Sequence, residues 1–137
     1  MIGTGGHLID EENAMIALNE IDPDAPFLSQ LSDQGEGPVT IINTFVAREG
    51  QLEEVIEAWR QDSVVMKAQP GFVSAQLYQG IAGSHVLINV AVWESTQELA
   101  AAFGSPEFQR LLALYPDGSK SYPHLVRRAA VTGVCVA

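Results

Sequence analysis

The segment HVLINVAVW at residues 85–93 constrains the fold of this chain more than any other. A short run of β-branched and apolar residues between turn residues is typical of a β-strand. Successive side chains of a strand point to opposite faces of its sheet. One face of this strand is wholly aliphatic and consists of Val86, Ile88, Val90 and Val92. The other face carries His85, Leu87, Asn89, Ala91 and Trp93. This composition predicts a sheet that is covered on both faces.

The rest of the chain supplies further strands and two helical regions. Strands are expected at residues 39–47, 72–80 and 124–136. Apolar residues three or four positions apart predict an amphipathic helix at 51–68. Two more helices are expected to begin at Ser95 and Ser105. The first start fits a capping box, and the second has a proline at its first helical position.

The order strand, helix, strand, strand, helix, strand predicts an α+β fold. It is the ferredoxin-like βαββαβ arrangement, an antiparallel sheet with the helices on one face. In this topology Asn43 of the first strand and Asn89 of the third are neighbours under the helices. A buried amide that lacks a hydrogen bond costs about 1–3 kcal/mol. The two amides therefore either bond to each other as structure or line a pocket beside Trp93.

The aliphatic row of residues 86, 88, 90 and 92 faces away from these helices. Monomeric proteins rarely leave such an apolar patch in water. We expect a second copy of the sheet to cover it, which gives a homodimer. The alternative is that an N-terminal helix covers it within one chain.

Charge divides the chain into two parts. Of 137 residues with a net charge of −10, residues 1–37 hold eight acidic residues and no Lys or Arg. Residues 38–137 hold nine acidic residues and all seven basic ones, so their charge is only −2. We expect an acidic N-terminal extension over 1–37, with a helix at 9–21 and a helical turn at 27–32, and a separate domain over 38–137. The extension is expected to pack on the partner subunit or over the mouth of a pocket.

Several functional classes are disfavoured by composition. So acidic a chain is not expected to bind nucleic acid or an anionic membrane surface. The sequence has no apolar run of the roughly 20 residues that span a bilayer, and its start does not resemble a signal peptide. The single cysteine, Cys135, predicts a reducing, cytoplasmic setting. The three histidines are far apart, so no metal site is expected.

Four segments together resemble the antibiotic biosynthesis monooxygenase domain, over about residues 38–136. They are IINTFVAREGQLEEVIEAW, QPGFVSAQLYQ, LINVAVWES and AAFGSPEFQRLLALYP. The resemblance implies a dimeric α+β barrel with a pocket between sheet and helices in each subunit. Several members of this family are oxygenases that use molecular oxygen as co-substrate and no metal, flavin or haem. They oxidise anthrones and related phenolic compounds to quinones.

The resemblance also implies a set of site residues. The family's catalytic asparagines and tryptophan correspond to Asn43, Asn89 and Trp93. Some members carry a tyrosine near the position of Leu99, and here Tyr78 or Tyr115 could take its place. Two further candidates come from the residues themselves. His85 shares a face with Asn89 and could act as a base if buried, and Arg110 could anchor a phenolate or lie on a solvated helix face.

The expected reaction starts with loss of a proton from an acidic C–H or O–H group that lies between aromatic rings of the substrate. The resulting anion passes an electron to O₂, and recombination gives a peroxide that loses water. The amides of Asn43 and Asn89 would stabilise the anion, and Trp93 would flank the ring. Haem-degrading relatives use a histidine near the position of Leu112, and no histidine lies between residues 86 and 123. The alternative function is a non-catalytic dimer that binds small molecules or serves a stress response.

Overall fold

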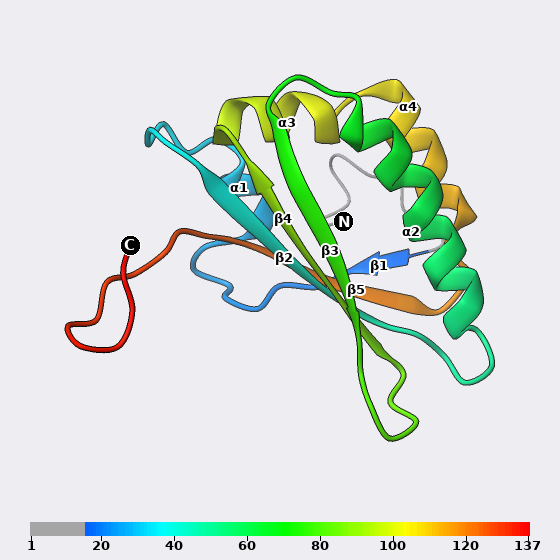
Figure 1. Ribbon diagram of the computed structural model, residues 1–137. Coiled ribbons are helices and arrows are strands. Elements are labelled where there is room, and N and C mark those ends of the chain that lie inside the picture. The colour runs from blue at the N-terminus through cyan, green and yellow to red at the C-terminus, as the bar shows by residue number, and fades with distance from the viewer. Residues whose placement is uncertain (1–15) are drawn as a thin grey trace.

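A five-stranded sheet in the order β1-β5-β2-β4-β3 forms the centre of the molecule (Figure 1). The computed structural model describes residues 16–137. In chain order the elements are β1 (Ile16–Leu18), α1 (Phe27–Gln30), β2 (Val39–Val46), α2 (Leu52–Lys67), β3 (Phe72–Gln79), β4 (Val86–Trp93), α3 (Thr96–Phe103), α4 (Pro106–Leu111), η2 (Leu112–Leu114) and β5 (Ser119–Val126). Figure 1 shows α2, α3 and α4 on the same face of the sheet.

The ferredoxin-like prediction is confirmed in the part of the chain from β2 to β5. Strand β2 pairs antiparallel with β4 on one side and with β5 on the other, and β3 pairs antiparallel with β4. The strands that contain Asn43 and Asn89 are therefore adjacent, as expected. Both expected helix caps are also present, because Ser95 Oγ accepts from the amide of Glu98 and Ser105 Oγ accepts from that of Phe108.

The helix expected at residues 9–21 is wrong where the structure describes it. Residues 16–18 form strand β1, which pairs parallel with β5 and makes the sheet mixed. The backbone amide of Asn19 continues this pairing by donating to the carbonyl of Ser121 at 2.7 Å. The open edge of β5 offers hydrogen bonds that an isolated helical turn cannot match. Residues 9–15 of the expected helix lie outside the described part, whereas the turn expected at 27–32 is present as α1.

The last strand lies earlier than expected, at 119–126 instead of 124–136. The sequence pattern misleads here because Pro123 is unusual within a strand. The neighbouring Leu125 directs its amide away from β2, to the Gln30 side chain at 2.8 Å. Pro123 lies two residues before Leu125, so its nitrogen also faces away from β2. Strand β1 pairs only with residues 119–121, so the missing N–H of Pro123 falls at the sheet edge. Residues 127–137 are exposed, and only a turn with a bridge between Val131 and Cys135 forms there.

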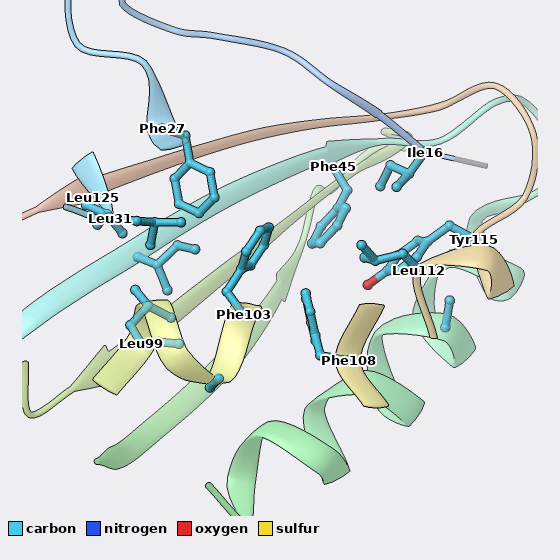
Figure 2. Packing of buried hydrophobic residues seen from close by; sticks show 14 of the residues in the cluster. Ile16, Phe27, Leu31, Phe45, Leu99, Phe103, Phe108, Leu112, Tyr115 and Leu125 are labelled. Carbon is cyan, nitrogen blue, oxygen red and sulfur yellow. The ribbon is translucent and has the colours of Figure 1, made fainter. Parts of the chain in front are cut away.

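The core lies between the sheet and the helices, and α1 contributes to it. Phe27 of α1 is fully buried and packs edge-on against Phe103, with ring centroids 5.3 Å apart. Phe103 in turn contacts Phe108 at 5.1 Å. Figure 2 shows Phe27 pointing toward Phe103 and Phe108. The described part of the N-terminal extension is thus built into the core of the same chain.

The opposite face of the sheet has a different character. The row of Val86, Ile88, Val90 and Val92 is only partly exposed, but none of the four is buried in the single chain. The adjacent row on β2 consists of Thr40, Ile42, Thr44 and Val46, which are also partly exposed. The described part of the extension therefore does not bury this face.

Candidate functional site

A cavity lies between the helix-covered face of the sheet and the helices. Its walls come from β1, α1, β2, α2, β3, β4, α3, α4, η2 and β5. The cavity itself has a volume of about 80 Å³, within a wider space of about 770 Å³ that includes open solvent. Most lining residues are apolar, and aromatic rings are prominent: Phe27, Phe45, Trp59, Phe72, Trp93, Phe103, Phe108 and Tyr115. A concave apolar site with few polar groups is typical of small-molecule binding.

The two asparagines lie directly opposite each other on the wall formed by the sheet. Asn43 of β2 and Asn89 of β4 are cross-strand partners, and both line the cavity. Their position follows from strand alternation, since the buried Ile41 and Phe45 flank Asn43 on the same face. The backbone groups of these strands are used in the sheet ladder. The two side-chain amides and the hydroxyl of Ser121 on β5 are therefore the polar side-chain groups that the sheet offers to the cavity.

The amides differ in their hydrogen bonding. The hydroxyl of Ser121 donates to Asn43 Oδ1 at 2.7 Å, so the oxygen of Asn43 has a protein partner. Asn89 Oδ1 is buried, and no group in the described chain donates to it. Buried acceptors without partners are rare, and each costs about 1–3 kcal/mol. This oxygen is thus available to a donor from a ligand.

Trp93 ends the row that contains Asn89. The side chain of Trp93 is 1% exposed and packs edge-on against Phe72, with ring centroids 5.5 Å apart. Ala91 lies between Trp93 and Asn89 on the same face and leaves space beside the indole ring. Asn43, Asn89 and Trp93 thus line one cavity, together with Phe72.

A buried acid–phenol pair, which local sequence patterns do not reveal as a pair, also lines this cavity. Asp62 of α2 is 6% exposed, and the hydroxyl of Tyr115 donates to its Oδ2 at 2.6 Å. Burial raises the pKa of Asp62 from 3.8 to about 7, although the bonds from Tyr115 and Ser63 act in the opposite direction. Burial, reinforced by the nearby Asp62 carboxylate, raises the pKa of Tyr115 well above 10.

The sequence does contain a signal for Asp62. The apolar stripe of α2 includes Trp59 and Met66, and Asp62 lies three residues after the first and four before the second. Residues at these spacings share one face of a helix. An acid within an apolar stripe is therefore the feature that identifies this position, and Trp59, expected to be a core residue, also lines the cavity.

The weaker candidates separate into two groups. Tyr115 lies in the cavity wall, as described. Tyr78 is 56% exposed and is paired with Ile88, so it belongs to the opposite face of the sheet. His85 and Arg110 are exposed and do not line the cavity. For His85 the reason is its place just before β4, where the strand emerges into solvent.

Residues 16–137 contain no group of three or more His, Cys, Asp or Glu side chains arranged to hold a metal ion. None of the helices in the same part of the chain is long and apolar enough to cross a membrane.

The sequence model of the antibiotic biosynthesis monooxygenases matches residues 38–114. The chain belongs to this family. A proposed monooxygenase from Shewanella loihica PV-4 is 34% identical, with a TM-score of 0.61, and the match covers 71% of this chain and 99% of that one. SnoaB, a cofactor-independent oxygenase from Streptomyces nogalater, is 23% identical, with a TM-score of 0.64 and coverage of 71% and 98%. A comparison with curated proteins found no match.

Proposed function

We propose that this family member is an oxygenase that uses O₂ without a metal, flavin or haem. Its substrate would be a polycyclic phenol of the anthrone type or a quinol. The observation that supports this most is the convergence of Asn43, Asn89 and Trp93 on one apolar cavity. The fold shared with SnoaB, which is an oxygenase of this cofactor-independent kind, agrees with the proposal.

The polar groups of the cavity match a phenolic substrate. The free Asn89 Oδ1 accepts a hydrogen bond from a phenolic hydroxyl. Because Ser121 already occupies Asn43 Oδ1, the N–H groups of Asn43 are available to an oxygen that becomes negative. Trp93 and the other aromatic walls hold the flat ring system. The N–H donors of Asn43, the acceptor oxygen of Asn89 and the aromatic walls would therefore contact different parts of one phenolic substrate.

The reaction follows the charge on the substrate. Loss of a proton gives an electron-rich anion, which passes one electron to O₂, and the two radicals combine to a peroxide. At a methylene carbon the peroxide loses water to leave a carbonyl, so that CH₂ and O₂ become C=O and H₂O. The amide N–H groups stabilise the anion, and the indole N–H of Trp93 can donate to the peroxide.

Oxygen consumption with the anthrone dithranol tests the proposal. We expect the wild type to consume O₂ faster than the double variant Asn43→Ala/Trp93→Phe. Asn19→Ala is a suitable control, because the side-chain amide of Asn19 bonds only to the nearby Ala17 carbonyl and Asn19 does not line the cavity. A wild-type rate no higher than that of the double variant would remove the proposal. Saturable binding of polyphenols, flavins or haem in thermal-shift assays, without any product, would favour the non-catalytic alternative.

The partly exposed aliphatic row of β4 supports a further part of the proposal, the homodimer. A second sheet packed on Val86, Ile88, Val90 and Val92 would remove this row from water. We expect light scattering at micromolar concentration to give the mass of a dimer, and Ile88→Lys to give a monomer. A wild-type protein that is monomeric under these conditions would contradict the dimer.

A further inference from the structure

We propose that Asp62 is the general base of the cavity and that Tyr115 positions it. Asp62 takes the proton whose loss turns the substrate into the anion that reacts with O₂. This inference rests on the proposed function, because it identifies the proton acceptor for that reaction.

The stacking of Tyr115 on Phe45 connects the pair to the strand that carries Asn43. Tyr115 bonds to Asp62 and also stacks on Phe45, with ring centroids 5.6 Å apart and planes 11° from parallel. Phe45 lies two residues after Asn43 on the same face of β2, a distance of about 7 Å along a strand. Figure 2 shows Tyr115 and Phe45 close together in the packed interior. The pair and the amides therefore line the same cavity, on walls that meet at Phe45.

The two oxygens of the carboxylate have different surroundings. Oδ2 accepts the short hydrogen bond from Tyr115, whereas Oδ1 has only a 3.4 Å contact from the hydroxyl of Ser63. We therefore assign Oδ1 as the atom that takes the proton. In this step the O–H or C–H bond of the substrate breaks and an O–H bond forms at Oδ1. The electron pair of the broken bond stays on the substrate.

The cavity holds no competing base among its described lining residues. Asp62 and Tyr115 are the titratable groups in the wall, and Tyr115 remains protonated because its pKa is raised well above 10. With a pKa of about 7, the Asp62 carboxylate is a much stronger base than an ordinary aspartate and is still partly ionised at neutral pH. The basicity of Asp62 and its place in the cavity wall therefore both suit the role of general base.

Charges on the packed elements lie away from the pair. Other titratable side chains on α2, and those on the elements packed against it, are all exposed: Glu53, Glu54, Glu57, Arg60, Lys67, Tyr78, Glu107 and Arg110. A titration seen inside the cavity near neutral pH is accordingly assigned to Asp62.

Charge balance gives a further reason for this assignment. Before the transfer the cavity holds one negative charge, on Asp62, and afterwards it holds one, on the substrate. The apolar walls therefore never enclose two anions, which would repel each other strongly in a low-dielectric site. The negative charge moves from a carboxylate with one strong hydrogen bond to an anion next to the asparagine N–H groups.

The test observes proton transfer without oxygen. Dithranol is mixed with the protein under anaerobic conditions, and the coloured anion is measured by its visible absorbance against a buffer blank. Quenching of the fluorescence of Trp59 and Trp93, which line the cavity, reports binding separately. The proteins compared are the wild type, Asp62→Asn, Tyr115→Phe and the control Asp117→Asn, which changes an exposed aspartate outside the cavity.

We expect the wild type and the Asp117 variant to form the bound anion at pH 8 and to lose it at pH 5. Asp62→Asn should bind dithranol without forming the anion, and in air its kcat should fall about 100-fold or more. Tyr115→Phe should move the midpoint of anion formation to higher pH, because the lost hydrogen bond lowers the pKa of Asp62 in the wild type. A purely structural contact would not shift this midpoint.

The outcomes separate the two proposals. If Asp62→Asn forms as much bound anion as the wild type, or if the wild type forms none at pH 8, the assignment of Asp62 as the base is wrong. Oxygen consumption by the wild type would still support the oxygenase in either case. If the anion forms only with Asp62 present but no O₂ is consumed in air, the base assignment holds and the proposed oxygenase function fails.

Discussion

Replacing Asp62 by Asn should make the protein more stable, and increasingly so as the pH rises. The folded state holds the Asp62 proton up to about pH 7, whereas the unfolded chain loses it near pH 3.8. Between these values the folded protein binds more protons, so the free energy of unfolding falls as pH increases. The whole effect is about 4 kcal/mol, since each unit of pKa corresponds to 1.36 kcal/mol. The wild type keeps this stability in full below pH 3.8, where Asp62 is protonated in both states, and has lost it once the pH has risen through 7.

Asparagine has a similar shape but no charge to bury, and its amide oxygen can still accept from the hydroxyl of Tyr115. The stability difference between Asp62→Asn and the wild type should therefore grow by about 2–3 kcal/mol from pH 5 to pH 8. Urea unfolding at fixed protein concentration, followed by tryptophan fluorescence, measures it. Asp117→Asn provides the control for an exposed aspartate. A difference that stays constant over this range, or that reverses in sign, would refute the reasoning that burial of Asp62 raises its pKa.

Three other substitutions test the packing and the site. Phe27→Ala should lower the free energy of unfolding by about 3–5 kcal/mol, because the ring is fully buried against Phe103; a loss below about 1 kcal/mol would show that the extension is not part of the core. Ser95→Ala should lower it by about 1 kcal/mol through loss of the helix cap, measured by urea unfolding. Asn89→Ala should change stability by less than about 1–2 kcal/mol, because its buried oxygen has no protein partner, yet it should weaken dithranol binding in a fluorescence titration. Unaltered dithranol affinity would contradict a role for Asn89 in binding.

Local signals were sufficient to predict the βαββαβ order, its helices and its first three strands, whereas the last strand was placed too late in the sequence. Alternation and β-branched residues located β2, β3 and β4 within one or two residues. Serine caps located the starts of α3 and α4. The same alternation put Asn43, Asn89 and Trp93 on the helix-covered face. Once the face of one strand residue is known, the period of two determines the faces of all the others. These predictions depended on features that lie within one element or between adjacent strands.

The missed features depend on contacts between distant segments. Three residues, Ile16–Leu18, do not reveal a strand, and β1 exists because β5 offers it an open edge. Pro123 is acceptable in β5 only because of that edge position, which the sequence alone does not show. The bond between Asp62 and Tyr115 joins residues 53 apart in sequence, and it forms because α2 and η2 pack together. Tertiary contact, rather than local preference, decides all three cases.

The residues that the fold does not need are the ones that best indicate function. The strand ladder is complete without the oxygen of Asn89, and α2 packs through apolar neighbours of Asp62. A buried unpaired oxygen and a buried acid of raised pKa both reduce stability, so packing gives no reason for either. Both groups lie in the wall of one cavity, where a bound phenol would donate a hydrogen bond to the first and a proton to the second. A single ligand thus accounts for two features that folding leaves unexplained, which is the physical argument for a reactive site at this place.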